Sequence, residues 1–327
     1  MNRFEWLEAR TLAEAVDAAA AGATVKAGAI DLLDLMKEGL LAPKRVVSLR
    51  RVPGLNAIAE ERGGLRIGAS ATLAEVAAHP VVRARYRALA DAAGGAASPQ
   101  IRNVATLGGN LLQRPRCWYF RSQHHHCLRK GGEACFAFAG ENQYHALFAH
   151  NGCAIVHPST PATALVAFDA RVELIAAKGR KRVVPLETFF VLPEQDITHE
   201  NDLQTGEILS AVLLPAPAGA RSAHLRQGEL DSFDWPLADV AAVLDVGERD
   251  ACRAASIVLG AAAPVPYRAK RAEQALVGKP VTEDSARAAA RAALEGAMPL
   301  SGNAYKLPIF EALVRRAILA AMNATQA

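Results

Sequence analysis

Four of the five cysteines lie close together in the middle of the chain. Cys117, Cys127, Cys135 and Cys153 fall within 37 residues, whereas Cys252 stands alone. In a reducing compartment this distribution indicates a metal centre rather than disulfides. Four thiolates complete the ligand set of either a 4Fe–4S cluster or a structural zinc ion.

The spacing of these cysteines favours the cluster. The intervals are 10, 8 and 18 residues, whereas structural zinc sites usually contain ligand pairs about two to four residues apart. Basic residues close in sequence are expected to offset the negative charge of the thiolates: Arg114, Arg116, Arg121, Arg129 and Lys130. On the chemistry alone, zinc and unligated thiols both remain open.

Two further features of the sequence, a run of three histidines and the fifth cysteine, are not expected to bind metal. Consecutive residues cannot all face one ion, so His124–His126 is expected on an exposed part of the cysteine loop. Cys252 stands just before a predicted strand, where a buried and unreactive thiol is expected.

A second candidate site is a pair of short loops that could hold a phosphate. Residues 101–111 contain a Gly-Gly pair, which lets the backbone approach a ligand with its N–H groups pointing at anionic oxygens. Thr106 and Asn110 add side-chain donors, and Arg102 adds charge. Residues 27–31 form a weaker second candidate, and an ordinary surface turn remains the alternative for each. Neither loop has the G-x-G-x-x-G spacing, which disfavours a Rossmann dinucleotide site.

Residues 101–111 resemble the I-R-N-x-A-T-x-G-G-N signature of the FAD-binding subunits of the xanthine dehydrogenase and carbon monoxide dehydrogenase family, the molybdenum hydroxylases. Residues 26–32 resemble that family's A-G-G-T-D-L loop, at the spacing the family uses. Similar segments at 157–170, 203–209 and 233–240 extend the resemblance over nearly the whole chain. The resemblance implies that both loops face the FAD pyrophosphate, and it assigns these residues to the cofactor: Lys26, Ala27, Gly28, Ala29, Ile30, Asp31, Leu32, Ile101, Arg102, Asn103, Thr106, Gly108, Gly109, Asn110, Leu203 and Arg226.

Two positions depart from the family pattern. Ala29 and Ile30 stand where the family has Gly-Thr, so one flexible position and one hydroxyl donor are missing. Thr160 stands where the family usually has Asp. The resemblance still implies that the backbone of residues 27–31 contacts FAD, but it gives little support for an FAD contact at residue 160.

The cysteine segment resembles a minority branch of the same family. That branch, which includes the 4-hydroxybenzoyl-CoA reductase subunit and a bacterial aldehyde oxidoreductase subunit, inserts a loop with four cysteines that bind a 4Fe–4S cluster. The run Arg-Cys-Trp-Tyr-Phe-Arg at 116–121 is most similar to the aldehyde oxidoreductase branch. The resemblance implies the ligands Cys117, Cys127, Cys135 and Cys153.

The resemblance also implies an electron-transferring role. Substrate, expected to be an aldehyde, is oxidised at a molybdenum cofactor on a large partner subunit. Electrons then pass through 2Fe–2S clusters on a small partner subunit to the FAD of this chain and on to an external acceptor. The protein holds and tunes its cofactors, so no catalytic side chain is assigned. Two other classes remain open: a non-catalytic zinc-stabilised assembly module, and a free-standing flavin oxidase of the vanillyl-alcohol oxidase fold.

A scaffold of helices and strands must position these sites. The expected fold class is α+β, with a two-subdomain FAD-binding domain of the PCMH type followed by a C-terminal α+β domain like that of CO dehydrogenase flavoproteins. The expected boundaries are 1–55 and 56–217 for the two subdomains, the latter with the cluster loop at 113–153, and 218–327 for the C-terminal domain. Residues 215–219 are the predicted linker.

Local patterns predict individual elements. Thr11–Glu14 and Thr72–Glu75 fit the capping box and precede Ala-rich helices, and a compact β-α-β unit is expected near the N-terminus. The predicted helices are 12–21, 31–39, 73–78, 81–93, 236–242, 268–277, 283–295 and 308–322. The predicted strands are 24–26, 46–49, 65–69, 171–176, 181–185, 243–247 and 253–261.

The overall composition disfavours several other classes. The 327 residues carry a net charge of only +4 without a long Lys/Arg block, so nucleic acid is not an expected partner. The first residues lack the basic start and apolar run of a signal peptide, and no apolar stretch of about eighteen residues could span a membrane. The chain is expected in the cytoplasm, or in the periplasm if an exported partner carries it.

Overall fold

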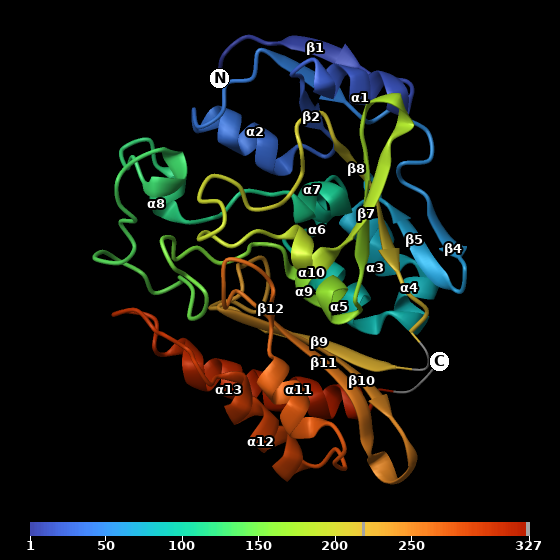
Figure 1. Ribbon diagram of the computed structural model, residues 1–327, viewed down its shortest axis with the longest axis vertical. Coiled ribbons are helices and arrows are strands. Elements are labelled where there is room, and N and C mark those ends of the chain that lie inside the picture. Colours follow the sequence, from blue (N-terminus) through green and yellow to red (C-terminus); the bar gives the residue numbers. More distant parts are fainter. Residues whose placement is uncertain (218–219, 325–327) are drawn as a thin grey trace.

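The computed structural model describes residues 1–217 and 220–324, and its strands form three separate sheets (Figure 1). The sheets follow one another along the sequence, within residues 5–48, 58–214 and 221–268. This mixture of helices and strands confirms the predicted α+β class. Each sheet falls inside one of the three predicted domains, whose boundaries remain predictions. The predicted linker lies partly outside the described residues.

The first sheet is parallel, with the order β1-β3-β2. Its strands are β1 (Glu5–Glu8), β2 (Thr24–Lys26) and β3 (Arg45–Ser48). α1 (Leu12–Ala20) and α2 (Ile30–Lys37) connect them, so the predicted β-α-β unit is confirmed. Thr11 Oγ1 accepts from the Glu14 N–H at 3.2 Å, as predicted. The Glu14 carboxylate instead accepts from the N–H of Arg10, so this capping box is incomplete.

The second sheet is antiparallel, with the order β4-β5-β8-β6-β7. Its strands are β4 (Ile58–Glu61), β5 (Gly64–Gly68), β6 (Arg171–Ile175), β7 (Lys181–Pro185) and β8 (Ile208–Leu214). The helices of this region are α3 (Leu73–Ala78), α4 (Pro80–Arg85), α5 (Arg87–Gly95), α9 (Thr160–Ala167), α10 (Leu186–Phe189) and the 3-10 helix η2 (Ala177–Gly179). The Thr72 capping box is complete, as predicted.

The helix predicted at 81–93 is interrupted, because Tyr86 leaves the helical conformation with φ of −132°. The Tyr86 ring is fully buried and packs edge-on against Phe168, with 5.3 Å between ring centroids. Its hydroxyl donates to the Pro215 carbonyl at 2.7 Å. Burial of this side chain therefore overrides the helical pattern and divides the segment into α4 and α5.

The predicted cluster loop, residues 113–153, contains little regular structure. It holds α8 (Trp118–Arg121) and the 3-10 helix η1 (Leu128–Lys130), and it follows the short helices α6 (Pro99–Arg102) and α7 (Leu107–Leu111). In Figure 1 this green segment extends to one side of the molecule, next to α2. Its shape therefore depends on backbone hydrogen bonds in turns, such as the Leu128 N–H to the Ala134 carbonyl at 3.1 Å, and on side-chain contacts rather than on a sheet ladder.

The third sheet is antiparallel, with the order β12-β11-β10-β9. Its strands are β9 (Arg221–Gln227), β10 (Ala238–Val246), β11 (Cys252–Gly260) and β12 (Tyr267–Arg268), with the 3-10 helix η3 (Glu248–Asp250). Three helices lie on the face away from α5 and α9 (Figure 1): α11 (Lys270–Leu276), α12 (Glu283–Ala293) and α13 (Lys306–Met322).

The helix predicted at 236–242 is wrong, because residues 238–242 form the first part of β10, which continues into the strand predicted at 243–247. Both β9 and β11 hydrogen-bond to this strand, while α13 packs on one face and α9 on the other. A strand that is buried on both faces lacks the alternating pattern that marks a strand in sequence. None of the described helices is long and apolar enough to cross a membrane.

Candidate functional site

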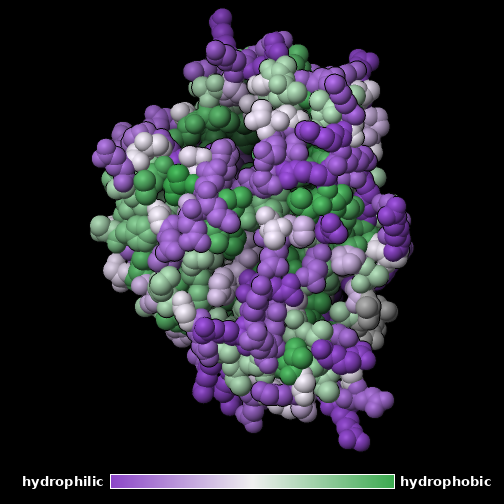
Figure 2. Space-filling view, in the orientation of Figure 1, coloured by the Kyte–Doolittle hydropathy of each residue, from purple (hydrophilic) through white to green (hydrophobic). Residues whose placement is uncertain are grey.

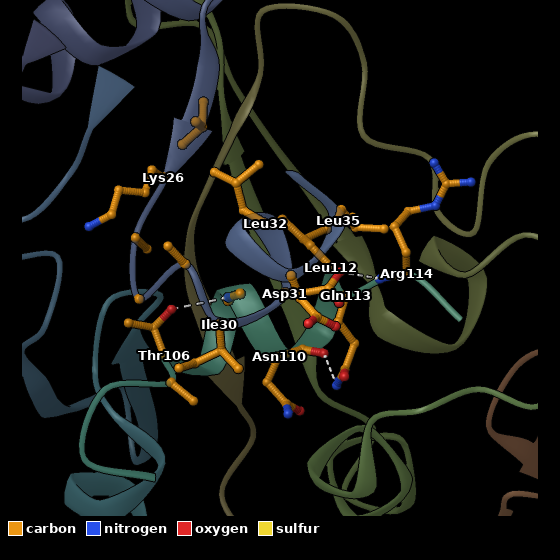
Figure 3. Close-up of a pocket in the computed structure, with 18 of the residues that line it drawn as sticks. Lys26, Ile30, Asp31, Leu32, Leu35, Thr106, Asn110, Leu112, Gln113 and Arg114 are labelled. Carbon is orange, nitrogen blue, oxygen red and sulfur yellow. Dashed lines mark hydrogen bonds between the residues drawn. The ribbon is translucent and has the colours of Figure 1, made fainter. Parts of the chain in front are cut away.

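The two predicted loops border one cavity of about 780 Å³, here named the loop cavity. The first loop connects β2 to α2, and the second, residues 101–111, runs from the end of α6 through α7, so a helix begins in each loop region. A cavity of this size lies within the range of pockets that hold cofactors. Ile30, Thr106 and Asn110 converge from the two loops, whereas the Lys26 amine points away from them (Figure 3). That amine lies 5.4 Å from the centre of the Trp6 ring.

The first loop presents backbone donors without a side-chain cap. Ala29 occupies the N-cap position of α2 in the left-handed conformation, with φ of 65°. Within this described stretch no side chain caps α2, so the N–H groups of its first turn are left for an anionic ligand. Gly28 packs against the second loop, where an added Cβ would lie 2.2 Å from the Val104 carbonyl oxygen. Glycine is therefore required where the two loops meet.

The second loop is held in place by neighbouring elements. Thr106 caps α7 by accepting from the N–H three residues later at 3.2 Å. The Gly108 N–H donates to the Ala69 carbonyl just after β5 at 2.8 Å, and an added Cβ at Gly108 would lie 2.8 Å from the Cβ of Ala69. The Asn110 amide oxygen accepts from the Ser159 hydroxyl before α9 at 2.6 Å. These contacts fix the loop against the second sheet.

All but three of the predicted cofactor residues border the loop cavity. Arg102 instead donates to the carbonyls of residues 96 and 97 at 2.7 Å each. Asn103 is exposed just past α6. Arg226 on β9 donates to the carbonyl at the end of α5 at 2.8 Å. The two arginines thus bond to backbone carbonyls of residues 95–97, and a contact of any of the three residues with a cofactor stays a prediction.

Three arginines of the cluster loop were expected near the cysteines, but they border the loop cavity instead: Arg114, Arg116 and Arg121. Asp31 in the first turn of α2 lies 2.6 Å from Arg121 and 2.9 Å from Arg116. Its other oxygen accepts from the backbone N–H of Arg114 at 2.8 Å. The Arg116 guanidinium also lies 5.0 Å from the ring centre of Trp235, between β9 and β10. The α2 carboxylate thus fastens the start of the cluster loop.

All four clustered cysteines border a second, much smaller cavity, here named the cysteine cavity, together with His145 and Arg129. About 10 Å³ of space remains between these side chains, which is near the limit for one water molecule. Among the described residues, no group of three or more potential ligands surrounds a single ion position. The geometry shows four converging thiols but no ready single-ion site.

The thiols of this cavity differ in acidity. Burial raises the pKa of Cys117 to about 11. A hydrogen bond between Cys135 and Cys153 lowers the pKa of Cys135 and raises that of Cys153, a rise that the positive charge of Arg129 opposes. His145 Nε2 lies 3.3 Å from Cys117 Sγ, and burial lowers the pKa of His145 to about 4. The cavity therefore combines one readily ionised thiol with a neutral imidazole near pH 7.

The three consecutive histidines do not border the cysteine cavity. His124 and His126 are exposed, as predicted. His125 is half-buried and packs edge-on against the rings of Tyr119 and Phe136, with 5.1 Å between centroids in each pair. The histidine that does lie beside a clustered cysteine, His145, was missed because no local pattern marks it.

The positions of three other residues bear on the predictions. Cys252 is 1% exposed at the start of β11, which confirms a buried thiol. Thr160 is buried in the first turn of α9 and is not among the residues that border the loop cavity. Arg129 is the one predicted basic residue that borders the cysteine cavity within the described part of the chain.

One apolar cluster lies between the two cavities. Leu35 on α2 borders the loop cavity. It packs with Phe120 and Cys127, which border the cysteine cavity. The two candidate sites are therefore neighbours in space.

Two family models match the chain almost end to end. Residues 2–217 match the FAD binding domain in molybdopterin dehydrogenase. Residues 223–321 match the CO dehydrogenase flavoprotein C-terminal domain.

Individual relatives cover the same length. The chain is 34% identical over 312 residues to the aldehyde oxidoreductase FAD-binding subunit PaoB of Escherichia coli, with 94% of each chain covered. It is 28% identical to the carbon monoxide dehydrogenase medium chain of Hydrogenophaga pseudoflava, with 98% of this chain and 97% of that one covered. A solved quinoline 2-oxidoreductase chain from Pseudomonas putida 86 superposes with a TM-score of 0.78 at 25% identity, over 100% of this chain and 99% of that one.

Proposed function

This chain belongs to the family of FAD-binding subunits of the molybdopterin dehydrogenases, and on that premise we propose that it binds FAD in the loop cavity. The observation that carries the proposal is the convergence of the two loops. Uncapped N–H groups of α2 and the two glycines of α7, which carry no side chain to block a close approach, border one space that could take a pyrophosphate. Bound flavin would supply one- and two-electron chemistry. The residues of this chain bind and orient it, and none acts as an acid, base or nucleophile.

The four clustered cysteines are the proposed ligands of a 4Fe–4S cluster. Four thiols border one cavity with buried Arg129 beside them, and this donor set fits such a cluster by type and number. The cysteine intervals of 10, 8 and 18 residues, without the close ligand pairs typical of structural zinc sites, favour it over a structural zinc ion. Since only about 10 Å³ is open, the thiol side chains must move apart to hold the cluster.

The proposed partners are a large molybdenum-cofactor subunit and a small 2Fe–2S subunit, and the proposed substrate of the complex is an aldehyde. The relative from Escherichia coli is named as a subunit of an aldehyde oxidoreductase, and the one from Hydrogenophaga pseudoflava as a medium chain. Apolar surface lies over the cluster loop (Figure 2), where Phe136 and Phe138 are 38% and 41% exposed. This surface is a candidate contact with a partner subunit.

The test is the cofactor content of the purified full-length chain, produced with ample iron and riboflavin. We expect about one acid-released FAD and about four iron atoms with matching sulfide per chain. A colourless protein with one zinc ion supports the assembly module instead. Aldehyde turnover by the chain without partners supports a free-standing flavin oxidase. A chain with neither flavin nor iron overturns the proposal.

A further inference from the structure

A buried group of three charged side chains connects the two cavities. Glu200, in the loop between α10 and β8, places one carboxylate oxygen 2.8 Å from Arg129 Nη1 and the other 2.8 Å from Arg114 Nε. The side chains of Arg129 and Glu200 are 1% and 7% exposed, and that of Arg114 is 32% exposed. This Arg–Glu–Arg triad joins residues from two positions in the cluster loop through one carboxylate.

The two ends of the triad belong to different cavities. Arg129 borders the cysteine cavity and Arg114 borders the loop cavity. The Arg114 guanidinium lies 4.9 Å from the ring centre of Phe120, in the apolar cluster between the cavities. A charged path therefore runs beside the apolar layer that separates the two sites.

The Arg129 end has unused hydrogen-bonding capacity. Its Nε and Nη2 are buried and have no hydrogen-bond partner among the described residues. Buried donors without partners are costly, so this end of the triad is suited to a negatively charged group in the cysteine cavity.

The triad as a whole carries one excess positive charge, since two guanidinium groups share one carboxylate. An unbalanced charge in a poorly solvated site is unfavourable unless an opposite charge lies nearby. Charges at such sites interact over longer distances than in water. A centre that gains an electron in either cavity therefore changes the electrostatic energy of the whole triad.

From these contacts we infer that Arg129, Glu200 and Arg114 couple the redox equilibria of the two cavities, so that a charge change at one shifts the reduction potential of the other. The inference rests on the proposed function, because it requires both FAD and the 4Fe–4S cluster. The three residues are positioning residues that act through electrostatics. Coupling of this kind is reciprocal, so it is measurable from either end.

Glu200→Gln provides the direct test in the complete complex. It removes the negative charge and leaves two guanidinium groups, which favours the reduced and more negative form at both sites. We expect the one-electron reduction equilibrium of the cluster to shift at least tenfold toward the reduced form, which is 59 mV, and the flavin potential to rise as well. The cluster is followed by EPR-monitored redox titration and the flavin by its visible absorbance. Glu60→Gln, which breaks an exposed ion pair with Arg85, should leave both potentials unchanged.

Arg114→Gln gives a second reading if Glu200→Gln fails to fold, because Arg114 is one-third exposed. It removes positive charge at the loop cavity, and we expect the cluster potential to fall at the far cavity. Unchanged cluster potential in this variant, or a Glu200→Gln shift confined to one cofactor, overturns the coupling. Wild-type protein without iron overturns the proposed cluster first, whereas iron present with unshifted potentials overturns this inference alone.

Discussion

The loop cavity and the cysteine cavity are neighbours, but they are built in different ways. The loop cavity is bordered by the starts of α2 and α7, which β2, β5 and α9 hold in place. The cysteine cavity is bordered by side chains of a segment with little regular structure. Main-chain donors of a folded helix stay in position without a ligand, whereas converging thiols depend on side-chain packing. The fold therefore preorganises the first site, while ion pairs to α2 position the second.

The largest expected effect is the complete loss of one cofactor while the other stays bound. In Cys127→Ser the cluster should be lost, with iron falling from about four atoms per chain to less than about one, because one of four ligands is removed. FAD should remain bound, since residues 26–32 and 101–111 lie outside the cluster loop. Iron assay and acid-released flavin measure both. Cys252→Ser is the matched control and should change neither, because Cys252 lies outside the cavity. Unchanged iron in a folded, flavin-containing Cys127→Ser protein excludes this thiol as a ligand.

The converse change should damage the loop cavity alone. In Gly28→Val the new side chain meets the Val104 carbonyl, since even its Cβ would lie 2.2 Å from that oxygen. Separation of the two loops should weaken FAD binding at least about a hundredfold, or about 2.8 kcal/mol, with iron retained. Flavin fluorescence titration measures the affinity. Gly94→Ala, where the Cβ would meet only ordinary contact at 3.6 Å, is the control. Equal affinities in the two variants would show that close packing of the loops does not matter.

A smaller effect is expected where the two regions are fastened together. The Arg121 side chain is 10% exposed and lies 2.6 Å from Asp31. Arg121→Gln should lower the free energy of unfolding by about 2 kcal/mol, measured by urea denaturation. Arg45→Gln breaks an exposed pair with Glu5 and should cost less than about 1 kcal/mol. If the two variants lose the same stability, ion pairs to α2 do not position the cluster loop.

The smallest effect concerns backbone strain at the start of α2. Ala29 has a φ of 65°, which is unfavourable for a residue with a Cβ. Ala29→Gly should raise the free energy of unfolding by about 0.5–1 kcal/mol, since relief of strain exceeds the added freedom of the unfolded chain. Ala18→Gly, inside α1, should lower it by about 1 kcal/mol. Thermal unfolding compares them, and destabilisation by both would argue against strain at residue 29.

The sequence predicted the loops better than it predicted their surroundings. Glycines and a capping threonine are local signals, and residues 101–111 lie where the pattern required. The direction of a long side chain is not local: Arg116 is next to Cys117 in sequence, yet it pairs with Asp31 on α2. Arg102 likewise turns to backbone carbonyls behind the loop. Which partner a charged side chain contacts depends on the packed structure.

The predicted helices and strands were likewise correct where the signal is local and wrong where tertiary contacts decide. Helices with a polar face and a cap, such as α12 with Thr282, could be predicted because their signals are local. The second half of β10 was predicted as the strand at 243–247, but its first half could not be, since the alanines and valines there are buried on both faces and carry no alternation. The break at Tyr86 depends on Phe168 and on Pro215, 129 residues away. Tertiary contacts of this range leave no trace in a local pattern.

The double use of one carboxylate affects how genetic variants at residue 31 are interpreted. Asp31 belongs by sequence to the flavin loop, yet its oxygens accept from Arg114 and contact Arg116 and Arg121. A missense change at residue 31 alters the first turn of α2 and also removes the ion pairs that hold the cluster loop. Loss of colour from such a protein therefore does not by itself identify which prosthetic group the residue serves, and flavin and iron must be assayed separately.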